Sequence, residues 1–132
     1  MNVVLLGYSK LARPANLPTA MADIMAGSSI SGLTVLIASD TFLGGAVSLN
    51  LLLLLISSTF LYAGGVVLND VFDFKIDQIE RPERPIPSGD VSLKGAALFG
   101  TGLEIAGIIL SFLSCIISPL AFITVVKFAA EK

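Results

Sequence analysis

The feature that most constrains this chain is a stretch of 27 residues, from Phe42 to Leu68, that contains no charged side chain. About 20 residues of α-helix are enough to cross the hydrocarbon core of a bilayer, which is about 30 Å thick. Two further apolar stretches flank it, one at about 17–38 with Asp23 near its start, and one at about 93–116 with Glu104 inside it. We therefore predict an all-α membrane protein, a transmembrane helical bundle with three full spans (about 17–38, 42–68 and 93–116).

Shorter segments connect and follow these spans. The polar residues 39–41 predict a turn between the first two spans, and Ser118–Pro119 predicts a turn or kink after the third. The apolar segment 120–130 that follows is too short to cross a bilayer as a straight helix. We expect residues 1–132 to form a single membrane domain, with three full spans and a short fourth segment.

The composition agrees with a membrane protein and excludes several other classes. Hydrophobic residues make up 55% of the chain and charged residues 14%, against roughly 25% charged residues in an average soluble domain. The net charge of -2 argues against a nucleic-acid-binding protein, which usually has a strongly basic face. The chain has no histidine, and its one cysteine, Cys115, lies in an apolar run and is interpreted as an inert thiol.

The positions of lysine and arginine predict how the chain is oriented in the membrane. The N-terminal flank has Lys10 and Arg13, the loop at 69–92 and its border have Lys75, Arg81, Arg84 and Lys94, and the turn between the first two spans has no basic residue. Basic residues favour the cytoplasmic side. We therefore expect an integral, multi-pass membrane protein whose N-terminus and 69–92 loop are both cytoplasmic, since two spans separate them.

Acidic residues gather directly after the charge-free span. Residues 69–90 contain nine of the eighteen charged residues of the chain. If the second helix continues, Asp70, Asp73 and Asp77 lie along one of its faces at positions i, i+3 and i+7. Asn69, Asp73 and Asp77 are similarly related, at positions i, i+4 and i+8. Three carboxylates this close repel one another unless a cation or bound protons compensate their charge.

Such a cluster, followed by basic residues, is suited to binding a metal ion and a diphosphate. Mg²⁺ prefers oxygen ligands and often combines one or two carboxylates with phosphate oxygens and waters. The side chains of Lys75, Arg81 and Arg84 can bind phosphate, and arginine offers a planar fork for it. The alternative is a solvated, charged helix end with a basic loop that sets the topology, but this does not explain the regular spacing beside a charge-free span.

The same residues resemble a known family. The pattern Asn69-Asp70-x-x-Asp73-x-x-x-Asp77 resembles the first aspartate-rich motif of the UbiA superfamily of intramembrane prenyltransferases. The segment 81–89, Arg-Pro-Glu-Arg-Pro-Ile-Pro-Ser-Gly, resembles the arginine-proline stretch that follows this motif, and the segment 13–16, Arg-Pro-Ala-Asn, resembles the start of the first helix. The order and the spacing agree over roughly residues 10–100.

This resemblance implies an enzyme that transfers a prenyl group from a prenyl diphosphate to a lipophilic, often aromatic, acceptor within the lipid bilayer, with Mg²⁺ as cofactor. It implies catalytic roles for Asp70, Asp73 and Asp77. Metal binding would involve Asn69, Asp70, Asp73 and Asp77, and substrate binding would involve Asn16, Lys75, Arg81 and Arg84. The physical basis is that metal and basic groups stabilise the charge that develops on the leaving diphosphate, while an apolar cavity excludes water.

The chain also departs from the family. The family has more spans and a second aspartate-rich motif, whereas the acidic residues after Asp90 are only Glu104 and Glu131. The chain is therefore interpreted as a truncated prenyltransferase that is inactive by itself, and the alternative is a non-catalytic membrane helical protein that retains half of the diphosphate site. Glu104 is interpreted as a packing residue, whereas Asp23 either faces the cavity or caps local polar groups. Self-association through exposed helix faces is a further expectation.

Overall fold

The part of the chain that the structure describes is helical. The computed structural model describes residues 3–30 and 42–130. Its elements, in chain order, are α1 (Val3–Leu11), the short 3-10 helix η1 (Pro14–Asn16), α2 (Leu17–Ile30), α4 (Phe42–Phe72), α5 (Phe74–Glu80) and α6 (Leu93–Ala130). The prediction of an all-α chain is confirmed for these residues.

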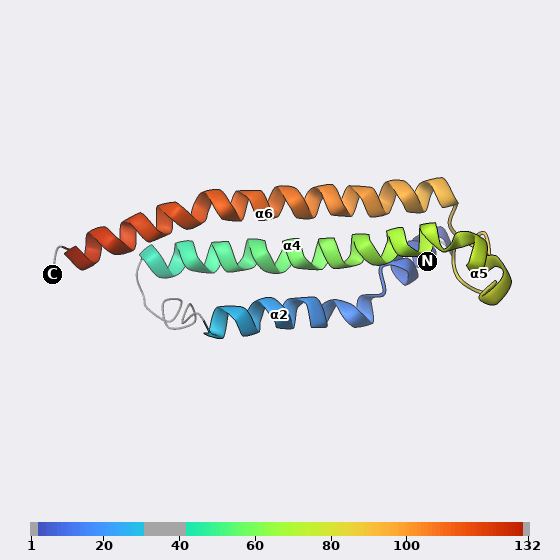
Figure 1. Ribbon diagram of the computed structural model, residues 1–132, viewed down its shortest axis with the longest axis horizontal. Coiled ribbons are helices and arrows are strands. Elements are labelled where there is room, and N and C mark those ends of the chain that lie inside the picture. The colour runs from blue at the N-terminus through green and yellow to red at the C-terminus, as the bar shows by residue number, and fades with distance from the viewer. Residues whose placement is uncertain (1–2, 31–41, 131–132) are drawn as a thin grey trace.

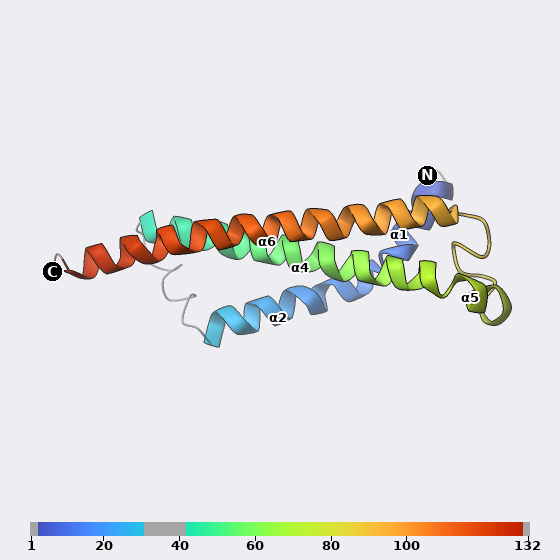
Figure 2. The ribbon, with the colours of Figure 1, turned by 45° about the horizontal axis from the view of Figure 1, so that its top comes forward.

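The three long helices form one layer, in which α4 lies between α2 and α6 (Figure 1). Both α2 and α6 pack on α4. The helices α1 and α5 lie at one end of the layer and the C-terminus lies at the other, as both ribbon views show (Figures 1 and 2). The N-terminal segment and the 69–92 segment are therefore at the same end, as the predicted orientation requires. That this end faces the cytoplasm stays a prediction.

Within the described ranges, two helices are long and apolar enough to cross a membrane, over Val47–Phe72 and Leu93–Ile117. They correspond to the second and third predicted spans. Helix α2 covers 14 residues of the first predicted span, a length of about 21 Å. The remainder of that span, 31–38, and the predicted turn at 39–41 lie outside the described residues. The first full span therefore stays a prediction.

Helix α6 corrects one prediction about the end of the chain. The turn that was one of the two expectations at Ser118–Pro119 is absent, and 120–130 is not a separate segment, because α6 continues as one helix from Leu93 to Ala130. The other expectation, a kink at this position, stays a prediction. A proline inside a helix removes one backbone hydrogen bond, and its ring crowds the carbonyl group of the preceding turn, but neither effect changes the pairing of the other backbone groups. Among apolar residues, continuing the helix keeps the other backbone groups paired, which is the favoured arrangement in a membrane.

Glycines allow α4 and α6 to approach each other closely. A Cβ atom built on Gly64 would lie 3.0 Å from the carbonyl oxygen of Gly100 and 3.0 Å from Cγ of Glu104. A Cβ atom built on Gly107 would lie 2.7 Å from Cγ of Leu61. Close packing of small residues is a common way for membrane helices to associate. Glu104 thus lies in the contact between the two helices, which agrees with its interpretation as a packing residue.

Hydroxyl and amide groups add hydrogen bonds between the same two helices. The hydroxyl of Ser57, which is buried, donates to the carbonyl oxygen of Gly107 at 2.8 Å. The hydroxyl of Ser114 donates to the side-chain oxygen of Asn50. Such bonds pair polar groups that an apolar environment would otherwise leave unsatisfied. They fix the register of α4 against α6.

A small apolar core fixes the segment after α5 against the end of α4. Its buried members come from α1, α4, α6 and the connecting segment, and they are Leu11, Val67, Ile86, Val91 and Ala96. The backbone N–H of Val91 donates to the carbonyl oxygen of Pro85 at 2.9 Å and so closes the segment on itself. The 69–92 segment is therefore not a free loop: it begins within α4, includes α5 and returns to the core.

Candidate functional site

The acidic motif lies where α4 gives way to α5. Asn69 and Asp70 belong to the last turn of α4, Asp73 is the residue between the two helices, and Asp77 belongs to α5. The backbone N–H of Asp73 donates to the carbonyl oxygen of Asn69, and that of Asp77 to the carbonyl oxygen of Asp73, each at 2.9 Å. These bonds keep Asn69, Asp73 and Asp77 one turn apart, as the four-residue spacing predicted. The side-chain amide of Asn69 also donates to Asp73 Oδ2 at 3.0 Å.

Asp70 lies at the centre of an ion-pair network. Its Oδ1 atom accepts a hydrogen bond from Arg13 Nη2 at 2.8 Å and one from Arg84 Nη1 at 3.1 Å. The same Arg84 nitrogen donates to Asp77 Oδ2 at 2.5 Å. Asp70 and Asp77 are 5% and 4% exposed, so both carboxylates are buried but paired. The network joins the segment before α2, the end of α4, α5 and the arginine-proline segment.

A cavity of about 360 Å³ opens beside this network. It is lined by Arg13, Asn69, Asp73, Ile76, Asp77, Glu80, Arg81 and Arg84. The wall therefore combines carboxylates and an amide from the acidic motif with guanidinium groups from two separate segments. This mixture of oxygen donors and cations can bind an anion together with a metal ion.

The structure brings most of the predicted site residues together. Asn69, Asp73, Asp77, Arg81 and Arg84 all line the one cavity. Three predicted residues are not among those that line it, namely Asn16, Asp70 and Lys75. Lys75 is exposed on α5 and stands two residues from both Asp73 and Asp77, a spacing that places it on the other side of a helix.

Arg13 lines the cavity although the sequence analysis did not select it as a site residue. A signal for it is present in the sequence. The chain has three arginines, Arg13, Arg81 and Arg84, and each is followed by a proline. The helical backbone conformation is disfavoured for a residue that precedes proline. The pattern therefore predicts that all three arginines lie in segments that connect helices. In the structure all three line the same cavity.

The charge on Arg84 is well supported by its surroundings. Burial lowers the pKa of its guanidinium group, but the hydrogen bond to Asp77 and the negative charges of Asp70, Asp77 and Asp73 raise that pKa above its ordinary value. An arginine in such a site stays protonated at every pH at which the protein is folded. Arg84 is therefore a permanent cation on the cavity wall.

The cavity wall offers oxygen atoms that a metal ion could use as ligands. Within the described residues, no three His, Cys, Asp or Glu side chains come together as a preassembled metal cluster. Asn69, Asp73 and Asp77 place one amide and two carboxylates on the same cavity wall. Mg²⁺ needs only one or two protein carboxylates when phosphate oxygens and waters complete its octahedral shell. The donor set therefore fits Mg²⁺ bound together with a phosphate-containing ligand.

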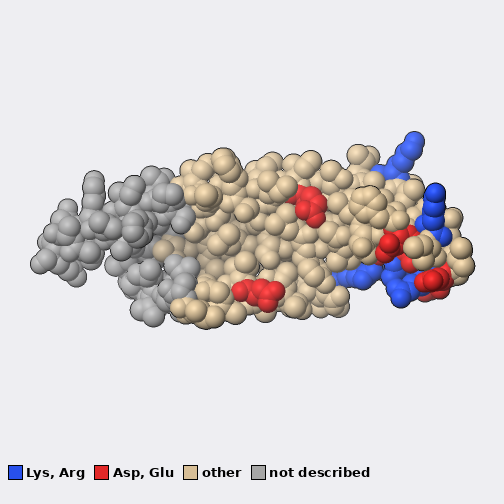
Figure 3. Space-filling view, viewed as in Figure 1, with Lys and Arg blue, Asp and Glu red and all other residues tan. Residues whose placement is uncertain are grey.

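Charged groups gather at this end of the molecule. Figure 3 shows basic and acidic side chains clustered at the end where α5 lies, while the rest of the described face is mostly uncharged and carries only isolated acidic groups. This distribution agrees with a polar end at a membrane surface and an apolar body within the bilayer.

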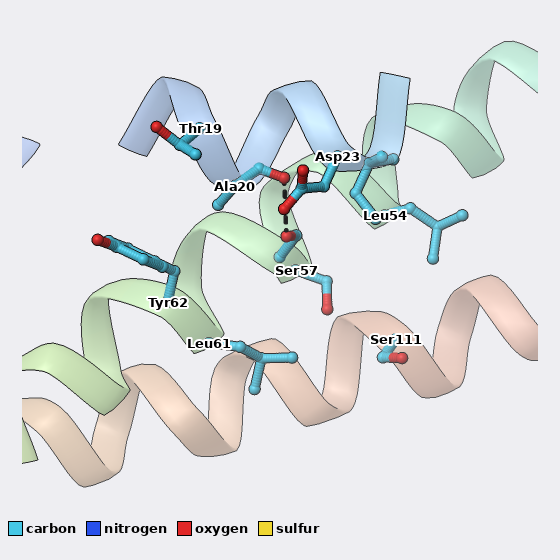
Figure 4. Close-up of a pocket in the computed structure, with 10 residues that line it drawn as sticks. Thr19, Ala20, Asp23, Leu54, Ser57, Leu61, Tyr62 and Ser111 are labelled. Atoms are coloured by element: carbon cyan, nitrogen blue, oxygen red, sulfur yellow. Dashed lines mark hydrogen bonds between the residues drawn. The ribbon is translucent and has the colours of Figure 1, made fainter. Parts of the chain in front are cut away.

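A second cavity, of about 400 Å³, lies deeper in the layer, between α2, α4 and α6 (Figure 4). Asp23 and Thr19 of α2, Tyr62 of α4 and Ser111 of α6 are among the residues that line it. Tyr62 and Asn69 are seven residues apart on α4, which puts them on nearly the same face of the helix. The two cavities therefore follow one face of α4. Asp23 lines this deeper cavity, which supports the first of its two interpretations.

Comparison with known proteins assigns the chain to a family. Residues 26–129 match the model of the UbiA prenyltransferase family. The chain therefore belongs to this family of transferases, whose members are integral membrane proteins. The predicted resemblance of this chain to that family is confirmed.

Three relatives of this chain carry the same name. The chain is 41% identical to the digeranylgeranylglyceryl phosphate synthase of Methanococcus aeolicus over 124 residues, which are 93% of this chain and 41% of that protein. It is 33% identical to the synthase of Methanobrevibacter smithii over 123 residues, 92% of this chain and 39% of that protein. With the synthase of Methanoculleus marisnigri it shares 44% identity over 85 residues, 64% of this chain and 30% of that protein. The chain thus spans between about a third and two fifths of the length of these relatives. No solved structure matches it.

Proposed function

We propose that this chain forms the diphosphate-binding part of a digeranylgeranylglyceryl phosphate synthase. Such an enzyme transfers a geranylgeranyl group from its diphosphate to a glyceryl phosphate that already carries one such group. The observation that carries the proposal is the single cavity that Asn69, Asp73 and Asp77 share with all three arginines of the chain. The name shared by the relatives supports the glyceryl phosphate acceptor, in place of the aromatic acceptor that the resemblance most often implies.

In this proposal Mg²⁺ is held by Asn69, Asp73 and Asp77. When bound, the metal ion neutralises charge that develops on the leaving diphosphate. The guanidinium groups of Arg81 and Arg84 bind diphosphate oxygens, since their planar forks match phosphate geometry. The hydrogen bond from Asn69 to Asp73 orients that carboxylate towards the shared wall.

The reaction breaks the bond between the allylic carbon and the diphosphate oxygen, and a new bond forms between that carbon and the acceptor hydroxyl oxygen, which loses its proton. The side chains of this site contribute by fixing the diphosphate and stabilising the negative charge that it gains. The apolar body of α2, α4 and α6 accommodates the prenyl chain in a region from which water is excluded. The end of the layer with α1 and α5 faces the cytoplasm, on the basis of its basic residues.

The proposal is tested by binding of geranylgeranyl diphosphate to the purified 132-residue chain in lipid nanodiscs at saturating Mg²⁺. We expect Asp73→Ala and Asp77→Ala each to abolish binding, because each removes an oxygen ligand of the metal. The matched control is Glu83→Gln, which changes an exposed carboxylate outside the cavity and should leave the Kd unchanged. Full binding by both aspartate variants would contradict the metal assignment.

The chain by itself is expected to bind the diphosphate without transferring the prenyl group. It spans 30–41% of the three relatives compared, and the resemblance implies a second aspartate-rich motif that this chain lacks. The check is an assay with labelled geranylgeranyl diphosphate and geranylgeranylglyceryl phosphate. Any labelled digeranylgeranylglyceryl phosphate formed by the 132 residues would overturn this expectation.

A further inference from the structure

Asp70 differs from the other members of the acidic motif in where its carboxylate lies. Asn69 and Asp73, on either side of it, line the diphosphate cavity, but Asp70 is not among the residues that line it. The residue is 5% exposed, and its Oδ1 atom accepts hydrogen bonds from both Arg13 and Arg84. Asp77 is equally buried and also accepts a hydrogen bond from Arg84, but it lines the cavity, whereas Asp70 does not line it and accepts hydrogen bonds from two arginines.

The two arginines that Asp70 holds come from segments far apart in the sequence. Arg13 lies 57 residues before Asp70, and Arg84 lies 14 residues after it. Both line the cavity. The carboxylate is therefore the one point at which the segment before α2 and the arginine-proline segment are joined to α4 by ion pairs among the described residues.

The backbone of Arg13 is strained in a way that supports a specific role. Arg13 has φ +46° and ψ +61°, and it is the only non-glycine residue with positive φ in the described part of the chain. The left-handed region is unfavourable for a residue with a Cβ atom. Strain of this kind persists when surrounding interactions hold the residue in place, and it is concentrated at functional sites. The bond to Asp70, at 2.8 Å, is the interaction that holds the Arg13 side chain.

We propose that Asp70 is a positioning residue, which holds the guanidinium groups of Arg13 and Arg84 together at the wall of the cavity so that both bind the same diphosphate. This inference rests on the proposed function. Each guanidinium group has five N–H donors in a fixed fork, and Asp70 takes only one of them from each arginine. The same Arg84 nitrogen, Nη1, also donates to Asp77, which leaves the other N–H groups of Arg84 for a ligand, and the side chain of Arg13 is 40% exposed and accessible to a ligand.

The same inference makes Arg13 a third diphosphate contact. A guanidinium group that is held by a buried carboxylate is pre-oriented, so less conformational entropy is lost when it binds phosphate. Asp70 thereby acts on the diphosphate through the arginines, and Asp73 acts on it through the metal ion. The two aspartates should respond differently to the same measurement.

The experiment measures binding of geranylgeranyl diphosphate to the full 132-residue chain in nanodiscs, first with ligand varied at saturating Mg²⁺ and then with Mg²⁺ varied at saturating ligand. Asp70→Asn should raise the Kd of the diphosphate by about tenfold, as expected for loss of a residue that orients a ligand-binding group. It should leave the Mg²⁺ midpoint unchanged. Asp73→Asn, in contrast, should raise the Mg²⁺ midpoint. An Asp70→Asn variant that raises the Mg²⁺ midpoint as Asp73→Asn does, or that leaves the Kd unchanged, would overturn the inference.

Variants of Arg13 keep the inference testable if Asp70→Asn does not fold, as judged by circular dichroism. Arg13→Lys keeps a positive charge beside Asp70 but loses the planar fork, and Arg13→Gln loses the charge. Both should raise the Kd of the diphosphate without changing the Mg²⁺ midpoint, and Arg13→Gln should have the larger effect. An unchanged Kd in Arg13→Gln would overturn the inference. Absence of Mg²⁺-dependent binding in the unaltered chain would contradict the proposed function itself, and with it this inference.

Discussion

The two halves of α4 are joined to the rest of the molecule by different interactions. At its C-terminal end, Asp70 is tied by ion pairs to segments 57 and 14 residues away in the sequence. In the middle of α4, from Asn50 to Gly64, the helix packs closely on α6 at glycine residues. Hydrogen bonds from the hydroxyl groups of single serine residues also join the two helices there. The arginine side chains at the charged end can bind an anionic ligand in place of an aspartate. The closely packed groups in the middle region cannot exchange their contacts for contacts with such a ligand. We infer that the middle of α4 fixes the architecture and that its charged end is the part that responds to ligand.

The largest effect is expected from overpacking the middle region. A Cβ atom on Gly64 would lie 3.0 Å from the Gly100 carbonyl oxygen and 3.1 Å from the Glu104 backbone nitrogen. Because these are backbone atoms, Gly64→Leu must separate α4 from α6, at a cost of about 3 kcal/mol. The change in unfolding free energy is measured by SDS titration in mixed micelles.

The matched control for this variant is Gly102→Leu on α6. A Cβ atom on Gly102 would meet nothing within 4 Å, so the substitution should leave stability nearly unchanged. Equal losses in the two variants would show that the close contact at Gly64 does not hold the helices together.

A smaller loss of stability is expected at the charged end. Arg84→Ala removes the partner shared by Asp70 and Asp77, and hydrogen bonds to charged groups contribute about 2 kcal/mol. Arg81→Ala is the control, because Arg81 lines the same cavity but forms no ion pair within the described residues. The same SDS titration should separate the two variants, whereas both should weaken diphosphate binding. If Arg84→Ala and Arg81→Ala had the same free energy of unfolding, the ion pairs of Arg84 would not contribute to stability as proposed.

The smallest effect is expected for a single hydroxyl in the middle region. Ser57→Ala removes the bond from Ser57 to the Gly107 carbonyl oxygen and should cost about 1 kcal/mol, as for other hydrogen bonds between membrane helices. Thr59→Val is the control, since the Thr59 hydroxyl bonds to Leu55 within its own helix. A loss in Thr59→Val as large as in Ser57→Ala would argue against a contribution that is specific to the contact between helices.

Much of this arrangement could be predicted from short-range patterns in the sequence. The charge-free stretch after Phe42 predicted α4, and the four-residue spacing of Asn69, Asp73 and Asp77 predicted that they share a wall. The first prediction depends on the length of an apolar run and the second on helical periodicity, and both are properties of a continuous stretch of sequence. Of the two alternatives predicted at Ser118–Pro119, a turn or a kink, the turn was wrong, because the local preference of proline was considered without the apolar residues on both sides that favour a continuous helix.

Two features of the site could not be predicted because they depend on contacts between distant segments. Asp70 was grouped with Asp73 and Asp77 on one helical face, but α4 ends at Phe72, and the Asp70 carboxylate pairs with two arginines. Arg13 lies beside Asp70 because of the way α1 and α2 pack on α4. Helical spacing cannot predict this contact, because the two residues belong to different segments of the chain. The shared arginine-proline pattern marks these arginines as residues of connecting segments, but not as neighbours.

The most direct test of the central claim is the Mg²⁺ dependence of geranylgeranyl diphosphate binding by the unaltered chain. Purified chain in nanodiscs is titrated with the diphosphate in the presence of Mg²⁺ and again in the presence of EDTA. The site described here predicts saturable binding with Mg²⁺ that is lost in EDTA and restored when Mg²⁺ is added back in excess. Equal binding under both conditions, or none under either, would contradict the assignment of this cavity as a metal-assisted diphosphate site.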